Sequence, residues 1–579
     1  MTYHICVLVS IGAFTILHWG NVLVQWRRRK ASRWQSLQGH DNEVVDRHAG
    51  ISSWDKKDVV EDTSIVSSSG SSASEATISA MQEEIPQHER SSLLHPAHKP
   101  TAEPSSISFV RAFLMYQPRP VPWFNKTLSS NGTSLLIVAF LALNVFYCTY
   151  NMEFSIRNSF VLANRWGLMF VANLPLLYLL AAKNQPLNFL TGRSYESLNI
   201  LHRRLGELLC LQALLHAVGM VITWYTIIRP SGRENFVQFL QNRVVYLGLG
   251  AFFAYELLYL TALGSFRQRF YELFLASHVV LQAAALIFVY YHHRIVGIYV
   301  GGALAIFLVD RIVFRGLVNV TSLSASAKIL EDGETIRLSI DHDILVKTRV
   351  FKSGWQATDH VFITVMALGK KHALMAHPFT IASSAHSTST KSADLELIIR
   401  AQAGFSRDLL NYVHRHDTLA LRLDGPYGSS HARRLLGDSN LSILVAGGSG
   451  IAVAWPLVAN LISQGDAESA LLHCPRKVVL IWVIHQDTHA SWLPSSSIEQ
   501  ARKNGVDVVI PRPTEEVGRP DLKSMVEEIV SRYDTGGERR RVGVVVSGPD
   551  GMNRSVRNTC AGLVWEGTDV NICVEKFGW

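Results

Sequence analysis

Two apolar stretches of the chain, LHRRLGELLCLQALLHAVGMVIT (201–223) and ELFLASHVVLQAAALIFVYYH (272–292), each hold two histidines fourteen residues apart. They are His202 and His216 in the first stretch, and His278 and His292 in the second. Fourteen residues fall about 40° short of four α-helical turns, so the two histidines of a pair lie near one face. The rise is roughly 21 Å, much of a ~30 Å hydrocarbon core. Two such helices side by side predict two pairs of facing imidazoles, able to ligate two stacked haems.

The repeated spacing decides between two interpretations of these histidines. A single histidine in a membrane helix can be an interfacial residue or a hydrogen-bonding partner between helices. Ionisable side chains in lipid are costly and usually functional, and chance rarely sets two pairs at equal spacing. We therefore favour haem ligation, with His293 as the alternative to His292 as a ligand.

Composition predicts a membrane part joined to soluble domains, because the 579-residue chain is 48% hydrophobic and long enough for several domains. The net charge of +8 comes without a basic block large enough to indicate nucleic-acid binding. The run Arg27-Arg28-Arg29-Lys30 is instead typical of the flank of a membrane span. The six cysteines are scattered and form no CxxC pair, which argues against a disulfide framework, zinc or a cysteine-ligated iron–sulfur cluster.

Seven segments are apolar and close to the ~20 residues that a spanning helix needs. They are residues 5–24, 133–150, 161–182, 201–223, 244–263, 272–291 and 295–314. From about 31 to 108 the chain is rich in Ser, Glu and His, with few aromatic residues, which predicts a disordered linker. The predicted N-terminal parts are a transmembrane helix or signal anchor (1–26), a disordered cytosolic linker (27–130) and a six-helix haem domain (131–318).

The pattern changes after residue 320 to short β-rich runs separated by turns, which is typical of a small antiparallel barrel. These runs are Thr335–Ile340, Val361–Met366, Leu395–Arg400 and Leu419–Leu423. From about 441, apolar strands alternate with helices, as in a doubly wound α/β unit. The strands include Leu441–Ala446, Val478–Ile484 and Val542–Val546, and the helices include Ala452–Ser463 and Asp521–Arg532. The predicted domains are a β-barrel over 319–435 and an α/β domain over 436–579.

A glycine-rich turn follows the first of these α/β strands. Leu441–Ala446 runs into Gly447-Gly448-Ser449-Gly450-Ile451 and then a predicted helix. Glycines in this setting let a phosphate approach backbone N–H groups at a helix N-terminus, where the dipole also favours an anion. The strand–turn–helix context favours nucleotide binding over a plain turn, although the spacing is not GxGxxG. Such a domain belongs in the cytosol, and counting back through six spans places residues 27–132 there too.

Other short motifs are ordinary turns when taken alone. His377-Pro378-Phe379-Thr380 follows a predicted strand, and Gly425-Pro426-Tyr427-Gly428 and Ser547-Gly548-Pro549 are of the same kind. The chain ends Glu575-Lys576-Phe577-Gly578-Trp579, which puts an aromatic residue at the last position. That aromatic residue is either a buried packing anchor or a plate that covers a flavin ring.

The order of these motifs carries a resemblance. The chain holds, in sequence, the two histidine pairs, HPFT (377–380), GFS (404–406), GPYG (425–428), GGSGI (447–451), GRPD (518–521), SGP (547–549) and the terminal aromatic residue. This series resembles the fungal ferric reductases of the FRE family over about residues 115–579. The phrases LHRRLG at 201–206 and YELF at 271–274 belong to the same resemblance.

The resemblance implies roles for individual residues. His202 and His278 would hold a cytosol-side haem b, and His216 and His292 an outer haem b. FAD would be bound by His377, Pro378, Phe379, Thr380, Ile381, Arg400, Gly404 and Ser406. The nicotinamide nucleotide would be bound by Gly447, Gly448, Ser449, Gly450, Ile451, His485, Arg519, Gly548 and Pro549. Ser547, Phe577 and Trp579 would act beside the nicotinamide and the flavin, with Trp579 shielding the flavin until NADPH displaces it.

Three positions depart from the family pattern. His485 stands where the family often has arginine, and Asp487 nearby suits a ribose hydroxyl, so NADPH and NADH both stay open. Ser547 stands where many relatives have cysteine, which implies a different placement of the hydride. Thr358-Asp359 replaces a Gly-Gln before the strand at 361, which leaves one contact to the flavin open.

The function expected from the resemblance is electron transfer from cytosolic NADPH through FAD and two haems to ferric chelates or siderophores outside, or to cupric ion, in iron uptake. The expected setting is the lipid bilayer of the plasma membrane, with a cytosolic C-terminal domain and an iron permease or oxidase as a partner. The nearest rival is an NADPH oxidase, in which oxygen takes the electron. A non-catalytic transporter or sensor is the rival from another class.

Overall fold

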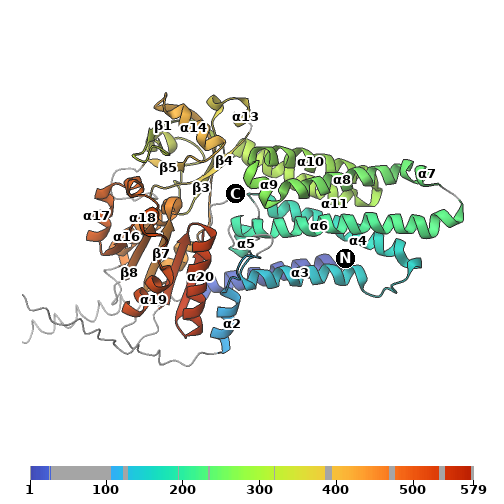
Figure 1. Ribbon diagram of the computed structural model, residues 1–579, viewed down its shortest axis with the longest axis horizontal. Helices are drawn as coiled ribbons and strands as arrows, with labels where there is room; N and C mark the ends of the chain where they lie inside the picture. The colour runs from blue at the N-terminus through green and yellow to red at the C-terminus, as the bar shows by residue number, and fades with distance from the viewer. Residues whose placement is uncertain are drawn as a thin grey trace, which may run out of the picture. The chain divides into compact units, whose positions relative to one another are not determined.

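The computed structural model describes residues 2–24, 27, 106–121, 128–184, 186–192, 195–232, 235–318, 320–373, 375–384, 394–468, 476–533 and 541–575. Apart from Val24 and Arg27, these residues belong to one compact unit made of Met1–Leu23 and Glu103–Trp579. Within it, a helical bundle is followed along the chain by an antiparallel barrel and a parallel α/β sheet (Figure 1). The predicted fold class is therefore confirmed.

Seven helices of the described chain are long and apolar enough to cross a membrane. They are Thr2–Val24, Asn131–Thr149, Ile156–Ala181, Leu198–Ser231, Arg243–Ala262, Tyr271–His292 and Arg294–Phe314. The bundle contains α3 (Asn131–Thr149), α4 (Ser159–Ala181), α6 (Tyr195–Thr223), α8 (Arg243–Ala262), α10 (Tyr271–His292) and α11 (Gly297–Leu308). Short helices α5 (Pro186–Thr191), α7 (Phe236–Gln241) and α9 (Gly264–Arg269) lie in the connections. The seven spans agree with the predicted segments.

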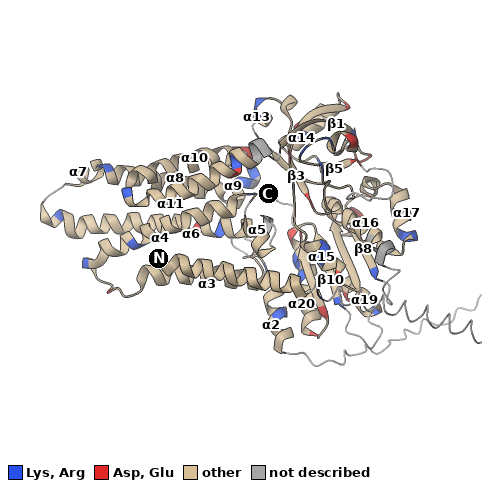
Figure 2. Ribbon diagram, turned by 180° about the vertical axis from the view of Figure 1, so that it is seen from behind, with Lys and Arg blue, Asp and Glu red and all other residues tan. Residues whose placement is uncertain are grey.

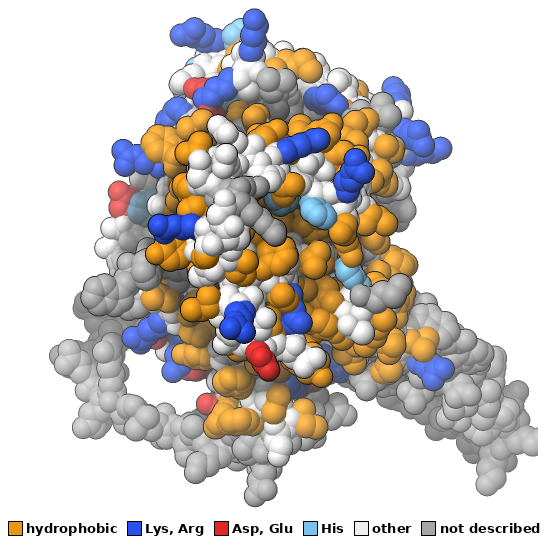
Figure 3. All heavy atoms as spheres, turned by 90° about the vertical axis from the view of Figure 1, so that its right-hand side faces the viewer, with side chains coloured by type: hydrophobic (Ala, Val, Ile, Leu, Met, Phe, Trp, Pro, Cys, Tyr) orange, Lys and Arg blue, Asp and Glu red, His pale blue; other side chains and the backbone are white. Residues whose placement is uncertain are grey.

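The bundle has the surface expected of a membrane domain. Its helices bury a shared core that includes Leu174, Leu209 and Ala285, each fully buried. Large hydrophobic side chains point outward along the same helices, for example Phe253 and Val280. Charged residues gather toward the helix ends (Figure 2), and hydrophobic side chains cover much of the face in Figure 3. Outward apolar side chains are stable only against lipid or another apolar partner.

The barrel is a six-stranded antiparallel sheet in the order β4-β3-β6-β1-β2-β5. Its strands are β1 (Val320–Ile329), β2 (Thr335–Ile340), β3 (His360–Thr364), β4 (His377–Thr380), β5 (Leu395–Arg400) and β6 (Thr418–Tyr427). A bridge between Ile381 and Leu397 joins the two outer strands and nearly closes the barrel. Helix α14 (Phe405–Val413) packs on its apolar core, and α12 (His342–Leu345) and α13 (Lys370–Ala373) lie in loops. HPFT is strand β4 and not a turn, because it pairs with β3.

The C-terminal sheet is parallel, in the order β11-β10-β7-β8-β9. Its strands are β7 (Leu441–Gly447), β8 (Lys477–Val483), β9 (Val506–Val509), β10 (Arg541–Ser547) and β11 (Asp569–Val574). The helices are α15 (His431–Gly437), α16 (Ile451–Glu468), α17 (Ser495–Lys503), α18 (Thr514–Val517), α19 (Leu522–Tyr533) and α20 (Asp550–Trp565). Alternate residues of β7 face opposite sides, so Leu444 packs with α16 and Ile443 with α19 and α20.

Helix α2 (Ser106–Met115) lies within the range 27–130 that the sequence predicts to be a linker. It packs against α20, where Ala112 is buried and Phe109 contacts the ring of Trp565. Arg111 donates to Asp569 (3.1 Å) and to the carbonyl oxygen of Val570 (3.2 Å) on β11. The segment just before the bundle is thus tied to the α/β domain.

Candidate electron-transfer sites

The outer histidine pair comes together in the bundle. His216 is on α6 and His292 ends α10, and their ring centroids are 6.2 Å apart with an interplanar angle of 85°. Two imidazoles that share one metal ion, each nitrogen ~2 Å from it, have ring centroids roughly 6 Å apart. The spacing of this pair therefore fits two axial ligands of one haem iron.

Backbone carbonyls set the tautomer of both outer histidines. His216 Nδ1 lies 2.7 Å from the carbonyl oxygen of Ala163, and His292 Nδ1 lies 2.7 Å from that of Val244. A carbonyl oxygen only accepts, so each Nδ1 carries the proton and donates it. Each Nε2 then keeps its lone pair, which is the arrangement of a metal-bound histidine with a fixed outer partner.

The inner histidines differ in this respect. His202 Nδ1 donates to the carbonyl oxygen of Leu177 at 3.0 Å. His278 Nδ1 is buried and has no hydrogen-bond partner among the described residues. The ring of Phe274, one turn earlier on α10, lies 5.4 Å from that of His278. The inner and outer histidines therefore have different surroundings, although both pairs have the same fourteen-residue spacing.

Two of the predicted FAD segments meet at the barrel. His377 at the start of β4 stacks on Phe405, at 3.9 Å between ring centroids and 14° between planes. Burial, and to a smaller extent the neighbouring His372, lower the pKa of His377 to about 4. His377 Nε2 and Thr380 Oγ1 are buried without a hydrogen-bond partner among the described residues. Such orphaned polar atoms fit a site that a polar ligand completes.

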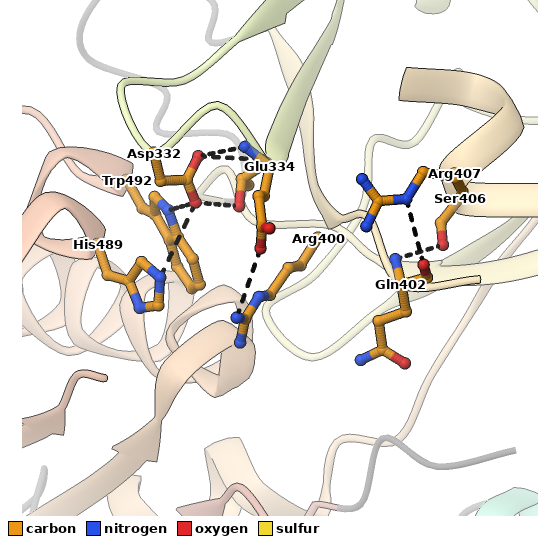
Figure 4. A network of polar contacts seen from close by, with 9 residues as sticks. Asp332, Glu334, Arg400, Gln402, Ser406, Arg407, His489 and Trp492 are labelled. Carbon is orange, nitrogen blue, oxygen red and sulfur yellow. Dashed lines mark hydrogen bonds and ion pairs between the residues drawn. The ribbon is translucent and has the colours of Figure 1, made fainter. Parts of the chain in front are cut away.

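Phe405 belongs to the second segment, which opens α14. Gly404 has φ +61°, a conformation that favours glycine, and it directly precedes this helix. Ser406 Oγ accepts from the backbone N–H of Gln402 at 3.0 Å, and the Arg407 Nε donates to the Gln402 carbonyl oxygen at 3.4 Å (Figure 4). Arg400, at the end of β5, pairs with Glu334 at 3.7 Å.

The predicted nucleotide segments also meet. The chain leaves β7 toward β8 on one side of the sheet and returns through β10 on the other, so β7 and β10 flank the switch point where α/β sheets bind ligands. Ala446 pairs with Ser547 in register at the carboxyl ends of these strands. A Cβ on Gly450 would overlap the Ser547 carbonyl oxygen, so only glycine permits this approach. Ser547 Oγ is buried without a partner among the described residues.

Of the remaining nucleotide residues, His485 lies just after β8 and Arg519 just after α18. His485 is exposed, and its Nδ1 is 3.0 Å from Thr514 Oγ1. Arg519 is exposed just after Gly518, at the end of the segment that Thr514 begins. Phe577 and Trp579 lie outside the described residues.

A buried junction between the barrel and the α/β domain was missed from the sequence (Figure 4). Asp332, in the turn between β1 and β2, accepts from Trp492 Nε1 at 3.0 Å and from Thr335 Oγ1 at 2.6 Å. Arg337 donates to the Trp492 carbonyl oxygen at 2.8 Å, and His489 stacks on the fully buried Trp492 ring. The only sign of this junction in the sequence is a tryptophan, Trp492, in a Ser-rich loop. The sequence does not indicate that its hydrogen-bond partner lies 160 residues away.

Family models match two parts of the chain. Residues 166–289 match the model described as the ferric reductase like transmembrane component, and residues 321–431 match an FAD-binding domain. His202, His216 and His278 fall inside the first match, and His292 lies just beyond it. The barrel strands β1 to β6 lie almost entirely within the second.

Several curated relatives come from fungi. The chain is 26% identical to ferric reductase transmembrane component 3 of Saccharomyces cerevisiae, over 63% of this chain and 49% of the relative. It is 27% identical to ferric/cupric reductase transmembrane component 2 of the same yeast, over 63% and 49%. It is 26% identical to the probable cell surface ferric reductase kap2 of Aspergillus oryzae, over 67% and 53%. The chain spans about half the length of these relatives.

Among solved structures, a flavohemoglobin from Malassezia yamatoensis is 13% identical with a TM-score of 0.34, over 73% of this chain and 99% of that one. A TM-score this low is no sign of a common overall arrangement. The family models and the fungal relatives agree with the geometry of the bundle and of the barrel. The chain therefore carries a ferric-reductase-like transmembrane component followed by an FAD-binding domain, and it is similar to fungal ferric and ferric/cupric reductases.

Proposed function

We propose that the protein is a transmembrane reductase that takes electrons from cytosolic NADPH and delivers them to ferric chelates or siderophores outside, with cupric ion as an alternative substrate. The facing pair His216 and His292, with both Nδ1 atoms donating to carbonyl oxygens, carries this proposal. When bound, FAD accepts a hydride and two b-type haems pass electrons singly across the bilayer. One NADPH then reduces two ferric ions and yields NADP⁺ and one proton.

The soluble residues would position the donor end of this route. Gly447 to Ile451 would admit the nucleotide phosphates, because this glycine turn lies directly before the N-terminus of α16. Ser547, Gly548 and Pro549 would lie against the nicotinamide, since they adjoin the glycine turn at the switch point. His377 to Ile381, Arg400, Gly404 and Ser406 would hold FAD, with Phe577 and Trp579 covering its ring.

The membrane residues would position the acceptor end. His202 and His278 would bind the inner haem on the cytosolic side, and His216 and His292 the outer one. This direction follows from a cytosolic α/β domain and from the order of histidines along α6. It sets the substrate on the far face of the plasma membrane, where an iron permease or oxidase would be a partner.

Nucleotide preference rests on two opposed groups. Arg519 is an exposed, permanently charged donor suited to a 2′-phosphate, whereas Asp487 suits a free ribose hydroxyl. We favour NADPH. The Arg519→Ala variant should raise KM for NADPH by about tenfold, a ~1.4 kcal/mol loss, and leave KM for NADH unchanged. Equal effects on both nucleotides would reject this role.

The decisive test removes one outer ligand. His216→Leu should abolish reduction of extracellular ferric chelate and retain reduction of the flavin by NADPH in the same membranes. His293→Leu is the matched control, because His293 is the adjacent alternative ligand and should prove dispensable. Ferric reduction that survives in His216→Leu would reject the two-haem route.

The electron acceptor needs its own measurement. Membranes holding the protein should form ferrous iron, trapped by ferrozine, much faster than superoxide under air. Superoxide as the main product would identify an NADPH oxidase instead. A purified protein with no Soret band would favour the non-catalytic alternative.

A further inference from the structure

Two glycines of the bundle stand directly against the outer histidines. A Cβ on Gly167, in α4, would lie 2.9 Å from His216 Nδ1 and 3.1 Å from His216 Cε1. A Cβ on Gly248, in α8, would lie 2.7 Å from His292 Cε1 and 2.9 Å from His292 Nδ1. A Cβ does not approach the atoms of another side chain this closely, so alanine at either position would force the imidazole to move.

Each imidazole is held where it touches the glycine. His216 donates to the carbonyl oxygen of Ala163, four residues before Gly167, and His292 donates to that of Val244, four residues before Gly248. In an α-helix these carbonyls already accept the N–H of the glycine itself. The imidazole ring therefore lies over the glycine, which has no side chain. From there it donates to a carbonyl oxygen on the preceding turn that already accepts the N–H of the glycine. A Cβ would separate ring and carbonyl.

The inner pair has no such arrangement among the described glycines. At none of them would an added Cβ have an atom of His202 or His278 among its three nearest neighbours, and a Cβ on Gly206 would meet only Leu177 Cδ1 at 3.9 Å. His278 also lacks an acceptor for Nδ1 among the described residues. The two ends of the bundle thus fix their histidines by different means.

We propose that Gly167 and Gly248 are positioning residues of the outer haem site. Together with the Ala163 and Val244 carbonyls, they form two matched seats that set the orientation of the His216 and His292 rings. This inference rests on the proposed function, because it assigns the seats to the haem that faces the substrate. A carbonyl partner also makes an imidazole a stronger donor to iron, so the seats act on ligand orientation and on ligand strength together.

The first test compares Gly167→Ala and Gly248→Ala with two control variants. In the control Gly301→Ala, the added Cβ would have no atom within 4 Å. In the control Gly206→Ala, on the same helix as His216, the added Cβ would make only an ordinary van der Waals contact with Leu177. The readouts are haem per polypeptide by pyridine haemochromogen assay and the low-spin ferric EPR spectrum. FAD per polypeptide controls for folding of the soluble domains.

Each seat variant should lose about one of two haems, or shift the EPR signal that is missing in His216→Leu. Both control variants should keep two haems and unchanged signals. Seat variants with two haems and wild-type spectra would overturn the proposal. Wild-type protein without any haem would instead overturn the proposed function.

A second measurement tests the seat without relying on haem. Thermal unfolding is recorded for Gly167→Ala alone, His216→Ala alone and the double variant, all purified in detergent. If an alanine at position 167 clashes with the imidazole of His216, Gly167→Ala should lower Tm in the wild-type background. The same substitution should lower Tm much less in the His216→Ala background. An equal cost in both backgrounds would mean ordinary helix packing and overturn the seat. If Gly167→Ala fails to accumulate, recovery in the double variant supports the seat and continued failure rejects it.

Discussion

At the scale of single residues, the burial of His377 makes the free energy of unfolding depend on pH. Its pKa is lowered to about 4 by burial and by the nearby His372, whereas an unfolded histidine titrates near 6.5. The unfolded chain therefore binds more protons than the folded one between pH 6.5 and 4. The stability that the neutral ring contributes is complete above pH 6.5 and is lost as pH falls toward 4.

His377→Gln should remove this pH dependence. The stability difference between wild type and the variant should shrink by roughly 2 kcal/mol from pH 6.5 to pH 5. Thermal unfolding at several pH values, followed by circular dichroism, measures it. Asp359, whose pKa burial raises to about 6, acts in the opposite direction but is common to both proteins. His414→Gln, which changes an exposed histidine after α14, is the matched control. A constant difference across pH would contradict the assignment.

At the scale of elements, a buried carboxylate contributes to the junction between the barrel and the α/β domain. Asp332 accepts from the backbone N–H groups of Glu334 and Thr335, at 3.2 Å and 2.9 Å, besides Thr335 Oγ1 and Trp492 Nε1. Its side chain is 1% exposed. Removing the carboxylate leaves the indole N–H buried without its acceptor, which costs free energy that a surface contact would not.

Asp332→Ala should therefore lower the free energy of unfolding by roughly 2–4 kcal/mol. Because the change falls at a domain junction, KM for the nucleotide should rise as well. Thermal unfolding and steady-state kinetics of flavin reduction measure both effects. Glu331→Ala is the matched control, since Glu331 is exposed in the same turn. A stable Asp332→Ala variant with normal KM would show that the junction is held elsewhere.

Helix α2 offers a second test at this scale. The Gln117 backbone N–H donates to Asn558 Oδ1 at 2.8 Å, and Asn558 Nδ2 donates to the Gln117 carbonyl oxygen at 3.0 Å. Asn558→Ala removes both bonds, and should speed chymotryptic cleavage near Phe113 and Tyr116 by about tenfold. Arg119→Ala, which changes an exposed side chain after α2, should leave cleavage unchanged. Equal cleavage of both variants would mean that α2 does not need this contact.

The sequence predicted the helices and strands whose buried residues recur at a regular interval. It did not predict single contacts between residues that are far apart in the chain. Hydropathy located the seven spans, and β2 and β5 have the predicted bounds, because burial on regular faces leaves a period in the sequence. Helix α2 was missed because it has only ten residues and directly follows a long polar segment. The seats at Gly167 and Gly248 were missed because glycine is common in membrane helices and only the packing of α4 on α6 and of α8 on α10 gives it a partner.

At the scale of the whole molecule, the order of spans fixes which loops share a side. Ser231 follows α6 and Ser265 follows α8, so one span separates them and they lie on opposite sides. With a cytosolic α/β domain, Ser231→Cys should react with an impermeant maleimide in intact cells. Ser265→Cys should react only after permeabilisation. The reverse pattern would invert the proposed direction of electron flow.

The equal fourteen-residue spacing on α6 and α10 has a consequence for the membrane itself. Within each helix the distance between the two histidines is set by covalent backbone geometry, at 1.5 Å per residue, and not by how the helix meets its surroundings. A thinner or thicker bilayer can tilt the helices or thin the lipid around them. It cannot change the distance along each helix between the inner and the outer histidine. In the proposed route, the separation of the two haem sites would therefore stay the same when the lipid composition changes.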